Sequence, residues 1–464
     1  LVGAPRGPSL ISEDSMIDDL DIQNPRGTIR NRLVQLLSAG PWIWPDPERF
    51  EGIVIPTASP PSWSTCWTTR RSRPGLLGRG PSGRLSSGCL RTHSGHRRQC
   101  SHRYGVDSVM CSAEARTGDG LEPERIPGWL SEVSPARLAE LWRMADRVRA
   151  QHVGDEIHLR GLVEISNHCV RSCRYCGLRA GIPGRTRYRM RDDEVMDCVQ
   201  QAVHRGMGTV VLQAGEDPCL DRDRIAGLVC RIKEATDLAV TLSLGERPRE
   251  DLRAWRAAGA DRYLLRFETS SPELFRRIHP PRTPDAPDRI EILGWLKELG
   301  YEVGSGVMVG IPGQTREDLA RDLALFQLLD LDMIGLGPFI PHPETPLGAS
   351  TRHVGPVADQ VPASAEMVCT TLALARLLCP RSNIPATTAL ATLDGASGLE
   401  RGLRSGANVI MPDLTPLHYR RLYEIYPSRV RPGEGGADPH GRTLLRIQAM
   451  GRAPGRGRGD SRVW

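Results

Sequence analysis

From about residue 125 onward, short apolar runs alternate with longer amphipathic runs, and this alternation constrains the fold more than any other feature of the chain. The apolar runs have the lengths and β-branched residues typical of strands, and the runs between them carry apolar residues at helical spacing. Strand–helix units repeated in this way predict a parallel sheet covered by helices. The eight expected strands are 158–166, 209–215, 239–245, 262–269, 302–310, 332–340, 383–393 and 407–414.

Eight such units predict an α/β fold in which the strands close into a (β/α)8 barrel of the TIM type. We expect this barrel, with an N-terminal helix and a C-terminal closing segment, to span residues 125–455. In such barrels the reactive groups lie at the C-terminal ends of the strands and in the loops that follow. Functional residues are therefore expected directly after the strands.

The two ends of the chain differ in composition from this central part. Residues 1–110 are rich in Arg, Pro, Gly and Ser and show little periodicity. A segment of this kind cannot bury enough apolar surface to offset the entropy lost on ordering, so we expect a disordered N-terminal extension. We expect residues 456–464 to form a flexible basic tail.

Composition excludes some functional classes. The chain has 464 residues, a formal net charge of +6, and no apolar run near the roughly 18 residues that a membrane-spanning helix needs. Its N-terminus lacks the basic-then-apolar order of a secretory signal, so we expect a cytoplasmic protein without membrane association. The arginines are dispersed among acidic residues, so the charge does not indicate nucleic acid as a partner.

Three cysteines, Cys169, Cys173 and Cys176, follow the first expected strand within eight residues. In a reducing compartment, closely spaced cysteines bind metal more often than they form disulfides. Structural zinc uses four ligands, usually as two separated pairs, and a second pair is missing here. An iron–sulfur cluster held by three cysteines would leave one iron open to a substrate or cofactor. A non-catalytic iron–sulfur or zinc-binding protein is the alternative.

The C-x3-C-x2-C spacing, with Tyr175 before the last cysteine, resembles the radical S-adenosylmethionine (SAM) enzymes. In that family the three cysteines hold a 4Fe-4S cluster that cleaves SAM reductively to a 5′-deoxyadenosyl radical. Further strings resemble its SAM-binding elements: LQAGEDP at 212–218, LLRFETS at 264–270 and GVMVGIPGQT at 306–315. The resemblance implies SAM contacts from Tyr175, Gly215, Glu216, Arg266, Glu268 and Arg289.

Local backbone geometry also predicts how Arg266 and Glu268 lie relative to each other. Both fall within the expected strand 262–269, and side chains two residues apart in a strand point to the same face. We therefore expect the two side chains to lie together, as charge-assisted contacts to a polar cofactor or as a structural ion pair.

Across 155–455, the strings CRYCGLR, VLQAGEDP, GPFIPHPETPL, NIPATTAL and GANVIMPDLTP resemble, in this order, the HydE maturases of FeFe hydrogenase. The resemblance implies a small iron–cysteine substrate, a reduced electron donor such as ferredoxin or flavodoxin, and other hydrogenase maturation proteins as partners. It also implies substrate contacts at or near C-terminal strand ends from Gln213, Thr241, Met333, Thr387 and Thr388.

Two further expectations follow from this resemblance. Because no cysteine follows Cys379, we expect one cluster only. Methylornithine synthase and biotin synthase share the barrel and the motifs, and they are the rival enzyme readings.

Overall fold

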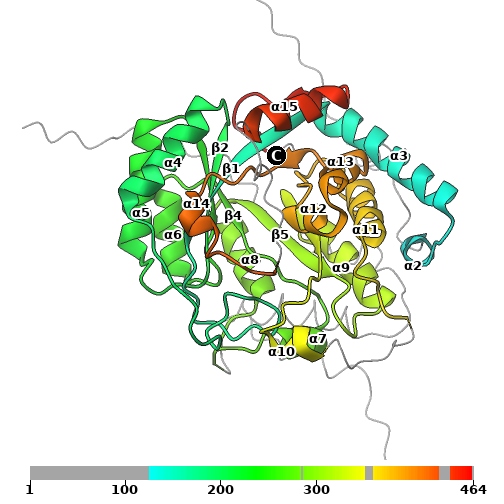
Figure 1. Ribbon diagram of the computed structural model, residues 1–464, viewed down its shortest axis with the longest axis horizontal. Coiled ribbons are helices and arrows are strands. Elements are labelled where there is room, and N and C mark those ends of the chain that lie inside the picture. The colour runs from blue at the N-terminus through cyan, green and yellow to red at the C-terminus, as the bar shows by residue number, and fades with distance from the viewer. Residues whose placement is uncertain (1–124, 284–285, 351–358, 428–438, 462–464) are drawn as a thin grey trace, which may run out of the picture. The chain divides into compact units, whose positions relative to one another are not determined.

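The computed structural model describes residues 125–461 apart from 284–285, 351–358 and 428–438. The expected N-terminal extension, residues 1–110, lies outside the described residues. Two helices, α2 (Ile126–Leu130) and α3 (Pro135–Val153), precede the first strand (Figure 1). Across the described ranges, no helix has both the length and the apolar character needed to cross a membrane.

Parallel strands form the centre of the part of the chain that the structure describes. Seven of them pair side by side in the order β6-β5-β4-β3-β2-β1-β7, so that chain neighbours from β1 to β6 are also neighbours in the sheet. The strands are β1 (Glu156–Ser166), β2 (Thr209–Ala214), β3 (Ala239–Ser243), β4 (Arg262–Leu264), β5 (Glu302–Val309), β6 (Met333–Pro338), β7 (Val409–Ile410) and β8 (Ala453–Pro454).

Helices connect the strands and cover the sheet (Figure 1). They are α4 (Asp192–His204), α5 (Arg222–Ala235), α6 (Arg249–Ala257), α7 (Pro272–Ile278), α8 (Arg289–Glu298), α9 (Arg316–Leu328), α10 (Pro346–Ser350), α11 (Ala365–Leu378), α12 (Thr388–Asp394), α13 (Ala396–Arg404), α14 (Leu417–Arg420) and α15 (Pro439–Ala449).

Several of these helices bury one stripe of apolar residues, whereas α11 is buried on all sides from Met367 to Leu378. In α4 the buried residues are Val195, Cys198, Val199 and Ala202, which recur at the spacing of one helix face. The strands are buried on both faces, as is typical of parallel sheets; β2, for example, is buried from Thr209 to Leu212. Each large apolar side chain buried here stabilises the fold by about 1.5–3 kcal/mol.

A segment without a regular strand joins the two outer strands, β6 and β7. Asn383 forms a parallel bridge to Met333, and Pro385 forms one to Val409. The Ile334 N–H donates to Asn383 O at 3.0 Å, which continues the same pairing. The predicted parallel (β/α) arrangement is confirmed, but isolated bridges take the place of one of its strands.

Three of the expected strands are much shorter in the structure. Strand 262–269 ends at Leu264, strand 407–414 is reduced to β7, and most of strand 383–393 is helical. Helix α12 begins at Thr388 because the Thr387 side chain accepts a hydrogen bond from the Leu390 N–H and caps the helix. The apolar pattern of a short run does not distinguish a buried strand from a buried helix.

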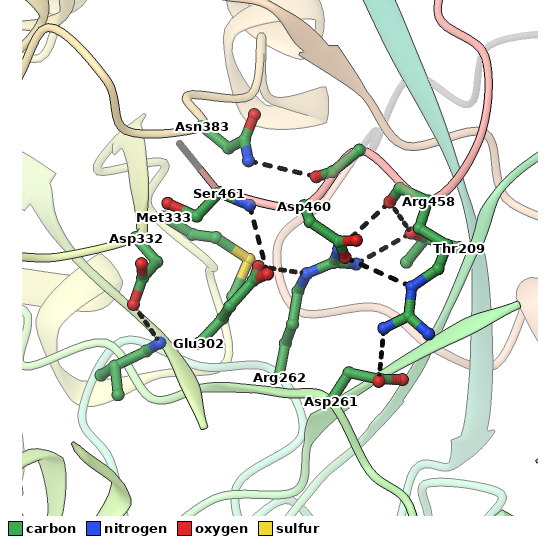
Figure 2. Close-up of polar contacts among 12 residues, drawn as sticks. Thr209, Asp261, Arg262, Glu302, Asp332, Met333, Asn383, Arg458, Asp460 and Ser461 are labelled. Carbon is green, nitrogen blue, oxygen red and sulfur yellow. Dashed lines mark hydrogen bonds and ion pairs between the residues drawn. The ribbon is translucent and has the colours of Figure 1, made fainter. Parts of the chain in front are cut away.

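The C-terminal segment, residues 453–461, lies against the N-terminal ends of the strands instead of forming the expected flexible tail. Strand β8 pairs with the start of β1. Arg458 contacts Asp261 and Asp460 contacts Arg262, both at 2.5 Å between nitrogen and oxygen (Figure 2). Because Asp261 and Arg262 stand at the start of β4, these pairs hold the segment across one end of the sheet.

Candidate active site

The cysteine loop follows β1 and is fixed by backbone hydrogen bonds to distant parts of the chain. The Val170 N–H donates to Glu216 O at 3.0 Å, and the Arg174 N–H donates to Ile278 O at 2.8 Å. The loop is thereby tied to the ends of β2 and α7. It carries three free thiols: Cys169, Cys173 and Cys176.

Burial raises the pKa of all three thiols. The pKa of Cys176 is raised to about 12, chiefly by burial and then by the charge of Cys169. The pKa of Cys173 is raised well above its usual range by burial, and Cys176 and Cys169 add to the rise. The thiols therefore lie close enough to disfavour charge on one another, and a bound cation would stabilise their thiolate forms.

The arrangement of the three thiols suits an iron–sulfur cluster better than a single metal ion. In the described part of the chain, no three His, Cys, Asp or Glu side chains converge as the ligands of a single metal ion would. A cubane cluster makes a different demand, since each cysteine binds a separate iron atom. Three neighbouring thiols fit a 4Fe-4S cluster that keeps one iron open.

Gly215 and Glu216 follow β2 and lie directly against the cysteine loop. A Cβ at Gly215 would stand 2.2 Å from His168 O, so only glycine permits this approach. The Glu216 carboxylate is 6% exposed and accepts a hydrogen bond from the Glu246 N–H at 3.1 Å. Burial, and then the charge of Glu246, raise the pKa of Glu216.

Arg266 and Glu268 lie together, as expected, but not through strand alternation. β4 has already ended at Leu264, and Glu268 has a left-handed backbone with φ of 65°. A backbone bridge from Glu268 to Val307 of β5 holds this conformation, and the two side chains approach to 3.2 Å. A non-glycine residue in this region costs of order 1–3 kcal/mol and typically occurs at functional sites.

Tyr175 and Arg289 complete the set of expected SAM contacts. The Tyr175 hydroxyl donates to Glu268 Oε1 at 3.3 Å. Arg289 is the first residue of α8, and its Nε donates to Glu246 Oε1 at 2.9 Å. Through Glu246, the structure links Arg289 to Glu216, so all the expected SAM residues belong to one connected group beside the cysteine loop.

Three residues of this group were not predicted from the sequence: the buried Arg171 and His279, and the partly buried Glu246. Arg171 Nη1 contacts Glu246 at 2.6 Å and Glu216 at 3.6 Å. His279 lies between Arg171 and Arg289, and burial together with these two guanidinium groups lowers its pKa far below the usual range, so the ring is neutral. Arg171 and Glu246 were detectable in principle, since both follow expected strands.

Several buried polar atoms at this site lack a hydrogen-bond partner among the described residues. They are Nε of Arg171, Nε of Arg266, Oε2 of Glu216 and Oε2 of Glu268. The two carboxylate oxygens lie within ion-pair distance of an arginine, at 3.6 Å from Arg171 and 3.2 Å from Arg266, but accept no hydrogen bond there. A buried polar atom without a partner costs about 1–3 kcal/mol. A cofactor with an ammonium group, a carboxylate and sugar hydroxyls would supply the missing partners, so these residues fit SAM.

A buried pair of residues positions the two loops that follow β4 and β5. Asp322 on α9 accepts a hydrogen bond from the Ser270 N–H at 2.5 Å, two residues after Glu268. Gln314 accepts from the Gly310 N–H at 2.7 Å, and its Nε2 donates to Asp322 Oδ2 at 3.4 Å. Burial raises the pKa of Asp322 to about 7.

The residues expected to contact the substrate lie at different positions along the strands of the barrel. Gln213 is near the end of β2 and donates to the Tyr423 hydroxyl at 3.3 Å. Thr241, in the middle of β3, is 2% exposed, and its hydroxyl has no hydrogen-bond partner in the described ranges. Thr387 and Thr388 stand at the start of α12.

Met333 does not lie at the C-terminal end of a strand, where it was expected. It is the first residue of β6, and its sulfur is 2.8 Å from Arg160 Nη1. A shift of the strand boundary by one residue would not bring Met333 to the C-terminal end, because β6 extends five residues beyond it. Met333 is therefore at the N-terminal end of the parallel sheet, whereas the cysteine loop lies at the C-terminal end.

Comparison with known proteins agrees with this geometry. Residues 163–326 match the model of the radical SAM superfamily. The "[FeFe] hydrogenase maturase subunit HydE" of Thermotoga maritima is 46% identical over 316 residues, which cover 68% of this chain and 87% of the relative. The 3-methylornithine synthase of Methanosarcina barkeri is 28% identical over 62% of this chain and 78% of its own length.

A solved structure of a methylornithine synthase, PylB, has a similar fold. Its TM-score is 0.61 at 25% identity, over 73% of this chain and 95% of the PylB chain. Of these relatives, the maturase is the more similar in sequence, and the synthase structure shares the fold. The chain belongs to the radical SAM superfamily and, within it, to the HydE family.

Proposed function

We propose that this chain is a HydE-type maturase that acts in the assembly of the FeFe-hydrogenase active-site cluster. The observation that carries the proposal is the set of three free thiols beside a group of carboxylates and guanidinium groups in which several buried polar atoms lack a hydrogen-bond partner among the described residues. The 46% identity to a HydE protein over most of its length selects the maturase among radical SAM enzymes.

In this proposal Cys169, Cys173 and Cys176 hold the cluster. When bound, the cluster and SAM supply an electron and a 5′-deoxyadenosyl radical. Glu216, with the backbone at Gly215, binds the SAM ammonium group. This role is supported by the buried Glu216 Oε2, which lacks a hydrogen-bond partner among the described residues.

The other polar residues of the group orient the remainder of SAM. Arg266 or Arg289 binds the carboxylate, and Glu268 binds the ribose hydroxyls. Tyr175 donates to Glu268 and limits the orientations of its carboxylate. These contacts are charge-assisted and lie in a water-poor site, where they are stronger than at a surface.

The substrate in this proposal is a small iron–cysteine compound supplied by a sister maturation protein in the cytoplasm. Gln213, Thr241, Thr387 and Thr388 would contact it from the barrel wall. The buried, unpaired hydroxyl of Thr241 supports a polar ligand at that height. Met333 would contact only a ligand that reaches the far end of β6.

Anaerobic reconstitution with iron and sulfide tests the first half of the proposal. The protein should bind one 4Fe-4S cluster and release 5′-deoxyadenosine from SAM when dithionite is added. A cluster with four protein ligands, a tetrahedral zinc ion, or the absence of 5′-deoxyadenosine would contradict it and favour a non-catalytic metal protein.

Maturation of an apo-hydrogenase tests the second half. Extract that lacks HydE but contains the other maturation proteins should gain hydrogenase activity when this protein is added. Formation of 3-methylornithine or biotin by the reconstituted enzyme, without any gain of hydrogenase activity, would contradict the proposal. It would identify the protein as a methylornithine synthase or a biotin synthase instead.

A further inference from the structure

Arginines cluster in the cysteine loop and in the segment that contacts it. The segments 170–180 and 272–282 together contain six arginines and a single carboxylate, Glu273. Of these arginines, four are exposed, and we call them the arginine patch: Arg174, Arg276, Arg277 and Arg282.

Two contacts bring the segments of the arginine patch together. The Arg174 N–H donates to Ile278 O at 2.8 Å, and Arg171 Nη2 donates to Pro280 O at 3.2 Å. Arg276 stands two residues before Ile278, and Arg282 stands two residues after Pro280. The end of α7 and the loop after it therefore lie directly against the cysteine loop.

The positive charge of the patch is not neutralised locally. In the described ranges, Arg174, Arg276 and Arg282 have no ion pair, and the two segments contain four exposed arginines but only one carboxylate, Glu273. Clustered charges of one sign create a field that attracts oppositely charged partners and speeds their association.

The patch also covers a short route to the expected cluster. Cys173 is 8% exposed, but its neighbours in the chain, Ser172 and Arg174, are both exposed. Arg174 stands between two of the expected cluster ligands, Cys173 and Cys176, so a partner bound at the patch would lie beside the expected cluster. Electron transfer slows steeply with distance, so a redox partner would bind best close to the ligands of the cluster.

We propose that the arginine patch is the docking surface for an acidic one-electron carrier protein of the flavodoxin or ferredoxin class. The proposal rests on the proposed function, since it needs a cluster at the cysteine loop. In each docking event the reduced carrier loses one electron and the oxidised cluster gains it. No proton or group is transferred.

Charge reversal in the patch provides the test. SAM cleavage is measured in the reconstituted full chain with reduced flavodoxin as donor, over a range of flavodoxin and salt concentrations, and separately with saturating dithionite. The test variant is Arg174→Glu/Arg276→Glu. The matched control is Arg253→Glu/Arg446→Glu, which reverses two exposed arginines on α6 and α15, where the described residues offer no ion pair.

In the test variant, kcat/KM for flavodoxin should fall at least tenfold at low salt, because electrostatic steering changes association rates by this factor or more. The dependence of kcat/KM on salt concentration should also become weaker. The control should change less than twofold, and the rate with dithionite should be unchanged in both. An unchanged kcat/KM in the test variant, or an equal fall in the control, overturns the docking proposal.

Other outcomes are also informative. If wild-type protein fails with dithionite itself, the proposed function fails before the docking surface is tested. If the test variant also loses the dithionite reaction, the milder Arg282→Gln variant decides: retained steep salt dependence and full kcat/KM for flavodoxin would refute the proposal. If the patch variant instead blocks only hydrogenase maturation, the surface binds a maturation partner and the carrier proposal is wrong.

Discussion

Removal of residues 456–464 should destabilise the barrel by about 3–5 kcal/mol, because this segment satisfies two buried guanidinium groups. Arg262 is fully buried and donates to Arg458 O at 3.1 Å and to Asp460 Oδ1 at 2.5 Å (Figure 2). Arg160 is 4% exposed and donates to Gly459 O at 3.1 Å. Burial lowers the pKa of Arg160 to about 9, which reflects the cost of keeping its charge there.

The magnitude follows from the hydrogen bonds that the truncation removes. A hydrogen bond to a charged group contributes about 1.5–3 kcal/mol, and the two buried arginines would lose three such bonds. Arg262 keeps its ion pair with Glu302 at 2.5 Å, and water entering the opened end would hydrate both arginines in part. These two compensations reduce the sum to about 3–5 kcal/mol, a large share of the 5–15 kcal/mol by which proteins are stable.

Thermal unfolding followed by circular dichroism measures the loss. The truncated protein should melt roughly 5–10 °C below the full chain. Removal of residues 462–464 alone is the control and should change little. Because Asp460 is about half exposed, Asp460→Ala should cost only about 1 kcal/mol. A melting temperature within 1–2 °C of the full chain would refute the claim that the segment satisfies buried charges.

Four further predictions concern the site and its surroundings. Cys173→Ala should abolish both cluster binding and SAM cleavage, as read from the visible absorbance and 5′-deoxyadenosine; a variant that still cleaves SAM would exclude Cys173 as a ligand. Thr388→Val should leave SAM cleavage intact but lower maturation about tenfold, the effect of one lost hydrogen bond to the substrate; equal losses in both assays would indicate a structural role. Removal of residues 1–109 should change neither activity, and a large loss would show that the extension is needed. Asp322 has a folded pKa of about 7, above its unfolded value, so its folded state holds the extra proton and stability should fall as pH rises from about 4 to 7; Asp322→Asn should flatten that fall in urea titrations, and an unchanged slope would assign it to another group.

Much of the site could be found from local patterns. The C-x3-C-x2-C spacing after an apolar run placed the cysteines in a loop beyond β1, and the structure has them there. Arg266 and Glu268 were expected to meet, and they do, but the strand argument was wrong. The chain leaves the sheet at Leu264, and pairing with Val307 then sets the backbone of Glu268.

The parts that were missed depend on contacts between residues far apart in the chain. Arg171 and His279 are 108 residues apart, and no local periodicity relates them. The C-terminal segment was expected to be flexible because its composition is basic and rich in glycine. Its charges are instead paired at the start of β4, 198 residues away in the case of Asp460 and Arg262.

The sequence by itself determined the order of the first six strands, the parallel sheet and the cysteine loop, since these depend on periodicity and spacing within short windows. Only the tertiary structure decided which charges are buried together, where β4 ends, and that the C-terminal segment lies across one end of the sheet. The physical reason is that a buried charge is stable only beside its partner. Folding, and not the local sequence, brings the partner there.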